Sequence, residues 1–497
     1  MRVRELIGQE YLQWEKGEVI TITAGTGKGK SDFIKNELYE RAKGENERIL
    51  FFLHRSNTVS QFEMELEQAN KSDCITLMTY QAFQVSLLKE EAIDLTEYKY
   101  IVCDEYHYFS NDSSFNKFTD VALNALLAHQ NDAVLILMSA TNGFINSYLE
   151  DDLKVQITHY PIPISYDFVE DIDFYIQEFE LYKLLDHQLK NGIKTIIFMD
   201  SATRSYKAYE KYREHSMFVC SEGNTTYSSK MDIVKRDKLL ENQKFDELFL
   251  FTTQTLDAGL NIIDDELDCI VADIADTDTL IQCIGRKRLL NDGDNVKLLI
   301  RNRTKAILGE DSRKIKKKLK HVEYFKQHGK QEYANKFYRE PDESQIVYYE
   351  LKQEGDFELK VNELAYSHLI YKQKIIESIK ETPNGYQQYI EELFGKTNTV
   401  LHDRYLDIHA SQLLSNYYAE KTVIENKPAK IEFAAKLNLK RGKSYAKTIS
   451  TINDELEKKQ TPYRLVEVDS RTKGGGDKKA WLVKALVLQP NGSYLLM

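Results

Sequence analysis

The sequence predicts an α/β protein with two parallel-sheet domains in tandem, followed by a mainly helical C-terminal region. Short β-branched and aromatic runs alternate with amphipathic stretches of helical length, first over residues 1–160 and again over 161–305. This alternation is typical of parallel strands joined by crossover helices. Beyond residue 305 long charged stretches dominate, which we divide into a helical accessory region, 306–427, and a basic C-terminal domain, 428–497.

The first domain is expected to contain five strands and three helices. The expected strands are Val19 to Thr23, Arg48 to Leu53, Cys74 to Met78, Tyr98 to Cys103 and Ala133 to Met138. The expected helices are Lys30 to Ala42, Val59 to Ala69 and Phe115 to His129. The pattern breaks near Pro161, and a second series of strands follows. These are Lys194 to Met199, Met217 to Cys220, Leu248 to Thr252, Asp268 to Asp273 and Val296 to Ile300.

The composition of the chain excludes several classes of protein. A chain of 497 residues with 42% hydrophobic content is long enough for about three domains with their own cores. The net charge of −11 excludes a surface that is basic throughout, so nucleic-acid contacts need local basic patches. The five scattered cysteines have no zinc spacing and fit a reducing compartment. The charged N-terminus and the lack of a long apolar run predict a cytoplasmic protein without membrane contact.

A glycine-rich loop follows the first expected strand and precedes the first expected helix. Such a loop presents backbone N–H groups to the phosphates of a nucleoside triphosphate. Its lysine would reach the β and γ phosphates, and its serine would hold Mg²⁺. The expected ATP-binding residues are Ala24, Gly25, Thr26, Gly27, Lys28, Gly29, Lys30 and Ser31.

Acidic residues end the fourth expected strand, at the edge where open α/β sheets bind nucleotides. Asp104 is expected to hold Mg²⁺ together with Ser31, and Glu105 to orient and activate the attacking water. ATP and Mg²⁺ are therefore the expected cofactors.

Several segments in this order make the chain resemble the superfamily 2 helicases of the DExH-box type, over residues 9 to 290. Ala24 to Ser31 resembles motif I, in which that family often has alanine first, and Asp104 to His107 is similar to motif II. Ser139 to Thr141 is similar to motif III, whereas the second Ser-Ala-Thr, Ser201 to Thr203, stands where motif IV belongs. The resemblance implies two RecA-like domains that close on ATP.

The resemblance also implies roles for residues of the second domain. Gln282 to Arg288 resembles motif VI, in which arginines reach the γ phosphate. Arg286 falls on the position of the first arginine finger. The second arginine of the family would stand at Leu289, and Arg288 comes one residue earlier. Gln282, Arg286 and Arg288 are therefore expected catalytic residues beside Lys30, Asp104 and Glu105.

Other implied contacts lie at strand ends. Thr253 to Asn261 resembles motif V, whose glycine, Gly259, would touch the nucleotide. An adenine-reading glutamine would be Gln9 or Gln13, with Gln9 preferred. Arg55, Thr79 and Thr253 would contact the phosphodiester backbone, although each can also be an ordinary polar residue at a strand end.

The C-terminal domain carries the basic patch. Between residues 428 and 485 there are 14 Lys or Arg against 7 Asp or Glu. Expected helices at Ile431 to Leu437 and Lys443 to Lys458 precede two strands, Tyr463 to Val468 and Ala480 to Leu486. This order is typical of a winged helix-turn-helix, which binds nucleic acid or proteins. Its expected nucleic-acid contacts are Lys443, Lys447 and Lys473.

The predicted function is ATP-dependent movement along nucleic acid, as a helicase or translocase. DNA is favoured over RNA because the C-terminal domain resembles a duplex-binding wing. An RNA helicase and a sequence-specific DNA-binding initiator or regulator with an ATPase switch are the alternatives. The basic run Arg313 to Lys320 is read as a solvated helix face. The sequence names no protein partner.

Overall fold

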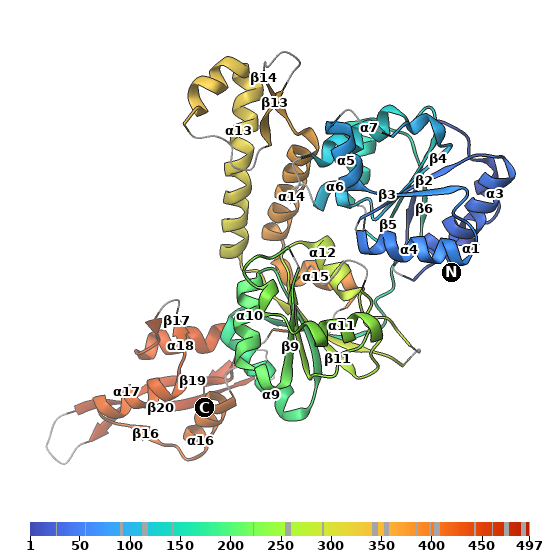
Figure 1. The fold of residues 1–497 in the computed structure, drawn as a ribbon. Helices are drawn as coiled ribbons and strands as arrows, with labels where there is room; N and C mark the ends of the chain where they lie inside the picture. The colour runs from blue at the N-terminus through green and yellow to red at the C-terminus, as the bar shows by residue number, and fades with distance from the viewer. Residues whose placement is uncertain are drawn as a thin grey trace. The chain divides into compact units, whose positions relative to one another are not determined.

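The computed structural model divides the chain into two compact units (Figure 1). One unit contains Met1–Asp171 and Gln188–Thr397, and the other contains Ile172–His187 and Asn398–Met497. The structure describes the whole chain except residues 26, 55, 90–92, 112–117, 142, 222, 254–259, 291–292, 340–345, 352–356, 384, 397–398, 402–407, 442–443, 460, 472–476, 489–493 and 497.

The first domain contains a six-stranded parallel sheet in the order β3-β2-β4-β5-β1-β6. Its strands are β1 Val19–Thr23, β2 Ile49–Leu53, β3 Ile75–Thr79, β4 Tyr100–Asp104, β5 Val134–Ser139 and β6 Ile157–Pro161. Its helices are α1 Val3–Ile7, α2 Lys30–Phe33, α3 Tyr39–Gly44, α4 Ser56–Gln68, α5 Tyr80–Leu88, α6 Tyr108–Asn111, α7 Thr119–Ala128 and α8 Gly143–Ser147. A π-helical segment, Ile34–Leu38, joins α2 to α3.

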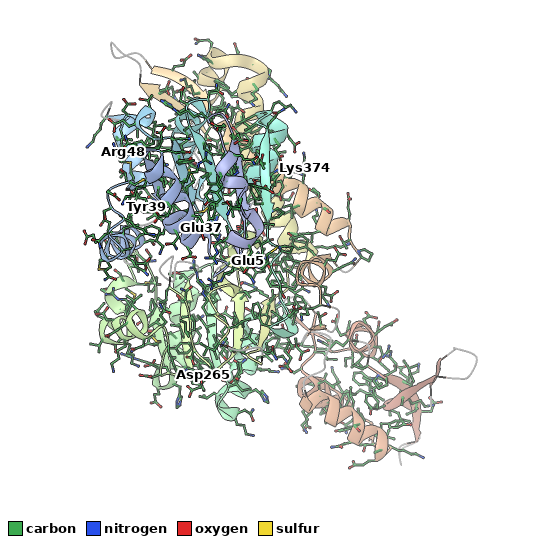
Figure 2. The ribbon with its side chains drawn as sticks, turned by 90° about the vertical axis from the view of Figure 1, so that its right-hand side faces the viewer. Glu5, Glu37, Tyr39, Arg48, Asp265 and Lys374 are labelled. Atoms are coloured by element: carbon green, nitrogen blue, oxygen red, sulfur yellow. The ribbon has the colours of Figure 1, made fainter. Side chains whose placement is uncertain are left out.

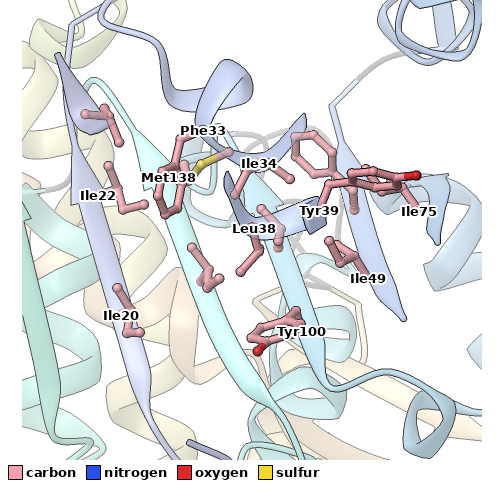
Figure 3. Packing of buried hydrophobic residues seen from close by; sticks show 14 of the residues in the cluster. Ile20, Ile22, Phe33, Ile34, Leu38, Tyr39, Ile49, Ile75, Tyr100 and Met138 are labelled. Atoms are coloured by element: carbon pink, nitrogen blue, oxygen red, sulfur yellow. The ribbon is translucent and has the colours of Figure 1, made fainter. Parts of the chain in front are cut away.

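Both faces of this sheet are buried, which explains why its strands are almost continuously apolar. Successive residues of a strand point to opposite faces, so Phe51 belongs to one core cluster and Phe52 to the other. On the first face, Phe33, Ile34 and Leu38 of the helical run after the glycine-rich loop pack against the strands (Figure 3). This packing fixes the helix that begins at the loop.

The second domain contains another parallel sheet, whose strands in the first unit follow the order β12-β11-β8-β10-β9. These strands are β8 Lys194–Met199, β9 Ser216–Val219, β10 Phe249–Thr253, β11 Leu267–Asp273 and β12 Val296–Arg301. The accompanying helices of this unit are α10 Ala202–Lys211, α11 Ile233–Asn242 and α12 Thr277–Ile284, whereas α9 Glu178–Asn191 lies mainly in the other unit. Two parallel sheets in tandem confirm the predicted fold class.

Ten of the strands were expected from the sequence, most of them within a residue or two of their bounds. Three strands of the two parallel sheets were not expected: β6, β7 Val169–Tyr175 and β15 Thr399–Leu401, and the last two pair in parallel with each other. β6 is an edge strand with exposed residues such as His159, so it lacks a continuous apolar run. It ends at Pro161, where the next residue, Ile162, donates its N–H to Thr23.

The region after the second sheet is mainly helical. It contains α13 Lys305–Phe337, α14 Glu363–Glu381 and α15 Gly385–Phe394, with an antiparallel hairpin of β13 Val347–Leu351 and β14 Phe357–Val361. Gly329 interrupts α13 with φ of 77° and ψ of 178°. In α14, Lys374 is exposed and is labelled in Figure 2. The hairpin was not expected.

The C-terminal unit contains a helical core against an antiparallel sheet of order β16-β20-β19. Its elements are α16 Ile408–Ala419, β16 Val423–Ile424, α17 Lys427–Leu437, β17 Lys440–Arg441, β18 Ser444–Tyr445, α18 Ile449–Lys458, β19 Tyr463–Arg471, β20 Asp477–Leu488 and β21 Tyr494–Leu496. Leu414 of α16 packs in the same core as Phe433 and Leu456. This core therefore begins upstream of the expected boundary at 428.

One helix prediction in this unit is wrong. The segment from Lys443 was expected to be helical, but Arg441 pairs with Ser444 in the β17–β18 hairpin, and α18 begins only at Ile449. The Thr448 hydroxyl accepts a hydrogen bond from Thr451 N and so caps the helix there. Lys447 is exposed and precedes α18 rather than lying on it.

Among the residues that the structure describes, no helix combines the length and the apolar character needed to cross a bilayer. All five cysteines are buried as free thiols.

Candidate ATP site

The glycine-rich loop leads directly from β1 into α2, as expected. Gly27 and Gly29 have φ of 78° and 85°, a backbone region that other residues rarely adopt. The loop is held at both sides, because Val3 N donates to Lys28 O at 2.9 Å and Ala24 N donates to Ser139 O at 3.0 Å. The loop is therefore fixed by α1 and by the end of β5.

Lys30 begins α2, and its side chain is buried inside the loop. Its Nζ donates a hydrogen bond to Ala24 O at 2.8 Å. The ammonium group thus uses a backbone carbonyl at the start of the loop as its acceptor. Ser31 follows in the first turn of the helix.

The two carboxylates at the end of β4 are strongly coupled. Burial, and then the charge of Glu105, raise the pKa of Asp104 to about 7. Burial also opposes ionisation of Glu105, but Lys30 and a hydrogen bond with His107 outweigh it and lower the pKa of Glu105. Glu105 has φ of 50°, a left-handed conformation that is unfavourable for a side chain of this size.

Asp104 Oδ1 is buried and has no hydrogen-bond partner among the described residues. A buried carboxylate oxygen without a partner is costly, and a cation would compensate it. Oxygen ligands of this kind suit Mg²⁺, which binds proteins through one or two carboxylates and the phosphates of its substrate. Asp104 therefore fits the expected magnesium role.

His107 connects the two domains of the first unit. Its Nε2 lies 2.7 Å from Gln282 Nε2 on α12, and its Nδ1 lies 2.8 Å from Ser139 Oγ at the end of β5. Because an amide nitrogen can only donate, His107 Nε2 accepts and Nδ1 carries the hydrogen. The same Nδ1 lies 3.2 Å from Glu105 Oε2. Gln282 is thereby linked to the acidic pair through one imidazole ring.

Ser139 also orders the segment that follows it. Thr141 N donates to Ser139 Oγ at 3.1 Å, so the serine hydroxyl joins the imidazole of His107 to the backbone that leads into α8. His107 and Ser139 were expected only as members of motifs II and III, without individual roles. Their position at adjacent strand ends, after β4 and β5, was the available signal.

Three consecutive basic residues follow α12. Lys287 pairs with Ile262 as an isolated parallel bridge, in which Ile262 N donates to Arg286 O at 2.8 Å and Arg288 N donates to Ile262 O at 2.9 Å. Lys287 is buried and forms a 2.7 Å ion pair with Asp294. The side chains of Arg286 and Arg288, on either side of it, are half-buried.

Both arginines of this segment lie near the candidate ATP site. The Arg286 guanidinium is close enough to Glu105 to help lower the pKa of that carboxyl. A methyl group placed on Gly27 would lie 3.4 Å from Arg288 Nη1. Arg288 Nε donates to Asn261 Oδ1 at 2.8 Å, which holds it in place. Burial, followed by the charge of Arg286, lowers the pKa of Arg288 to about 10.

The surroundings of the other predicted site residues that the structure describes indicate no particular role in ATP or nucleic-acid binding. Gln9 is exposed and precedes the 3₁₀ turn Glu10–Gln13. Thr79 caps α5, its hydroxyl accepting from Ala82 N at 3.0 Å. Thr253 is buried at the end of β10. Thr26, Arg55, Gly259, Lys443 and Lys473 lie outside the described residues.

The raised pKa of Asp104 predicts a pH-dependent cost to stability. The folded protein retains the Asp104 proton up to about pH 7, whereas an ordinary Asp loses it near pH 4. The free energy of unfolding should therefore fall as pH rises through this window, because the folded state binds more protons there. We expect Asp104→Asn to stabilise the nucleotide-free protein at pH 8 by up to roughly 4 kcal/mol, because each pH unit between the two pKa values corresponds to about 1.4 kcal/mol.

The stabilising effect of Asp104→Asn should disappear at pH 5, where wild-type Asp104 is already neutral. The measurement is the free energy of unfolding by denaturant at both pH values, with Asp132→Asn, an exposed carboxylate, as the control. A variant that is less stable than wild type at pH 8 would contradict the expected cost.

No protein-family model matches the sequence, and no curated protein matches it. Among solved structures the chain is similar to S. cerevisiae Dbp5 bound to RNA and ADP BeF3, at 15% identity over 63% of this chain and 90% of that chain, with a TM-score of 0.44. It is also similar to Mycobacterium smegmatis helicase Lhr bound to ssDNA and AMP-PNP, at 10% identity over 63% of this chain and 44% of that chain, with a TM-score of 0.37. Similarity to the DUF1998 helicase MrfA bound to DNA and AMPPNP has 17% identity over 66% of this chain and 53% of that chain, with a TM-score of 0.44. These values assign the chain neither a family nor an activity, so its function has to be inferred from its own residues.

Proposed function

We propose that this chain hydrolyses ATP between its two parallel-sheet domains and uses the reaction to move along nucleic acid, as a helicase or translocase. The observation that carries the proposal is the hydrogen bond between His107 and Gln282, which joins the acidic pair of one domain to the α12 segment of the other. Arg288 approaches Gly27 across the same site. An ATP site built from two domains couples hydrolysis to their movement.

In the proposed reaction a water oxygen attacks the γ phosphorus, and ADP leaves. Lys30 would exchange Ala24 O for phosphate oxygens, and Glu105, held ionised by Lys30 and His107, would accept a hydrogen bond from the attacking water. Mg²⁺ held by Ser31 and Asp104 would neutralise charge on the β and γ phosphates. Arg286 and Arg288 would stabilise the charge that develops on the transferred phosphoryl group.

Arg286 and Arg288 would bind the γ phosphate of an ATP molecule held by the first domain. Loss of that phosphate would therefore remove their contact with the first domain. The His107–Gln282 hydrogen bond would then be free to break, and the domains would separate. Thr79 and Thr253 end β3 and β10, at the carboxyl edges of the two sheets, and are the proposed contacts to the nucleic-acid backbone. Alternating contact at these edges would give net movement along a strand.

We further propose that the C-terminal unit is a winged helix that binds duplex DNA. α16, α17 and α18 share one core with the β19–β20 hairpin, the order expected of that fold. Lys447 is exposed immediately before α18. A basic residue at a helix N-terminus has access to a DNA phosphate. RNA remains the alternative ligand.

Lys447→Ala is expected to weaken duplex binding about equally for all sequences and to lower the salt dependence, the slope of log K against log [salt], by about 1. Fluorescence anisotropy with labelled duplex DNA at several salt concentrations measures both. Lys421→Ala, which removes an exposed lysine from the same unit, is the matched control. An unchanged salt slope for Lys447→Ala would exclude a phosphate contact at this position.

A strand-displacement assay on forked DNA, run beside ATP hydrolysis on the same substrate, tests the proposed activity. Release of the labelled strand with ATP, and not with a non-hydrolysable analogue, is the result expected of a helicase. Hydrolysis without release would identify a duplex translocase. Selective protection of one DNA sequence would favour the initiator or regulator, and stimulation by RNA alone would favour an RNA helicase.

A further inference from the structure

α14 of the helical region contacts both domains of the first unit. Its first turn belongs to the core of the first domain, because Leu364 is buried among the aromatic residues on one face of that sheet. One turn later, His368 stacks on Phe144 of α8 with ring centroids 4.6 Å apart. Burial, followed by the charge of Lys372, lowers the pKa of His368 to about 3, so this ring is neutral at physiological pH.

The contact between α14 and α8 is close. A methyl group on Gly143, the first residue of α8, would lie 2.9 Å from the Tyr371 hydroxyl. α8 begins two residues after Thr141, which is hydrogen-bonded to Ser139. α14 therefore packs against the segment that carries Ser139 and the His107 contact.

The next residue of α14 reaches the second domain. Lys372 Nζ forms a 3.1 Å ion pair with Asp276 Oδ2. The other oxygen of Asp276 caps α12 by accepting from Thr279 N at 3.0 Å and from Thr279 Oγ1 at 2.9 Å. Both oxygens of Asp276 are thus occupied, one by its own helix and one by α14.

α12 carries or directly precedes the proposed catalytic residues of the second domain. Gln282 lies on this helix and donates to His107, and Arg286 follows two residues after the helix ends at Ile284. A second contact from the helical region, between Tyr389 of α15 and Thr277 Oγ1 at 3.4 Å, supports the same helix start. The position of α12 is therefore set by α14 and α15 at one end and by His107 further along.

We propose that Lys372 is a positioning residue, which through Asp276 orients α12 so that Gln282 and Arg286 meet the ATP site of the first domain. The inference rests on the proposed ATPase function. It assigns to the helical region the role of a brace that joins α8, in the first domain, to α12, in the second. ATP binding itself would depend on the glycine-rich loop and not on this brace.

Lys372→Met removes the charge and keeps most of the apolar stem. We expect kcat for ATP hydrolysis to fall about 10-fold, because small misplacements of catalytic groups are costly, while the KM for ATP changes little. Lys374→Met, which removes an exposed lysine from the same helix, is the matched control and should retain wild-type kcat (Figure 2). Lys372→Arg should restore most of the loss by keeping the ion pair.

Asp276→Asn provides an independent variant, because asparagine still caps a helix but lacks the charge. It should reproduce the loss in kcat, and the double variant with Lys372→Met should be no worse than either single variant. Equal kcat for Lys372→Met and Lys374→Met would overturn the proposal. Proportional loss of kcat and thermal stability in both lysine variants would overturn it as well.

Hydrogen exchange separates this inference from the proposed function. Amides of α12 should exchange faster in Lys372→Met than in wild type or Lys374→Met, whatever reaction the protein catalyses. Unchanged exchange of the α12 amides in Lys372→Met would contradict the proposed positioning role of Lys372. Absence of ATP hydrolysis in the wild-type protein, with faster exchange in the variant, would reject the ATPase proposal and retain the brace.

Discussion

Lys30→Ala is expected to lower kcat for ATP hydrolysis by about 10²-fold or more, because it removes a preorganised positive charge from the phosphate site. The buried Nζ donates only to Ala24 O, the carbonyl at the start of the loop, among the hydrogen bonds described for it. Alanine should leave the loop backbone in place, since Gly29 O still accepts the first hydrogen bond of the helix from Phe33 N, and Val3 N still donates to Lys28 O. The loss should therefore be one of phosphate binding and not of folding.

A steady-state ATPase assay with a thermal melt of each variant checks this expectation. Lys43→Ala is the matched control, because Lys43 lies on α3 of the same helical run and pairs with Asp73 at the surface. If Lys30→Ala hydrolyses ATP at the wild-type rate and melts at the wild-type temperature, the nucleotide does not bind at the glycine-rich loop.

Arg286→Ala is expected to lower kcat by about 10³-fold with little change in ATP binding, the effect of removing an arginine finger. The guanidinium lies near Glu105, so its charge acts where the γ phosphoryl group would react. Arg288→Ala should cause a large loss as well, because Nη1 faces Gly27 of the phosphate loop. We expect both variants to lower the rate of the chemical step more than the affinity for ATP, because both arginines come from the second domain and not from the loop that would bind ATP.

Single-turnover hydrolysis measures the effect of each variant on the chemical step. Equilibrium binding of a fluorescent ATP analogue measures its effect on ATP affinity. Arg313→Ala, at an exposed position of α13, is the control for loss of an arginine. If Arg288→Ala retains wild-type kcat while Leu289→Arg raises it, the second finger belongs at the family's usual position. That result would contradict the assignment of Arg288.

The candidate ATP site could be predicted from the sequence to the extent that it is local. The loop at Ala24 to Ser31 and the carboxylates Asp104 and Glu105 follow strands directly, and strand ends meet at one edge of a parallel sheet. The placement of Arg288 depends on the bridge between Ile262 and Lys287, a contact between residues far apart in sequence. Arg288 stands one residue before the position of the family's second arginine, yet its Nη1 lies close to Gly27 of the glycine-rich loop.

Contacts made by helices of the accessory region could not be predicted. Lys372 lies in a charged amphipathic stretch in which nothing distinguishes it from Lys374. Only the packing of Leu364 and His368 against the first domain turns Lys372 toward Asp276. Likewise, the β17–β18 strand pair stands where the sequence predicted the start of a helix, and the Thr448 hydroxyl caps α18, which begins only at Ile449.

Two features of the acidic pair Asp104 and Glu105 are unfavourable for the stability of the folded protein. Asp104 has a buried oxygen without a described partner, and Glu105 adopts a left-handed backbone conformation. Features of this kind persist when the surrounding structure enforces them, and they concentrate at functional sites. Here the hydrogen bond from Tyr80 to Asp104 O, at 2.9 Å, and that from Tyr106 N to Met138 O, at 3.1 Å, hold the strained turn on both sides.

The most direct test of the proposed function is the rate of ATP hydrolysis by the 497-residue protein with and without single-stranded DNA, duplex DNA or RNA. We expect slow hydrolysis by the protein alone, a severalfold or greater increase with nucleic acid, and loss of both rates in Lys30→Ala. A hydrolysis rate that does not respond to any nucleic acid, or one that survives in Lys30→Ala, would contradict it.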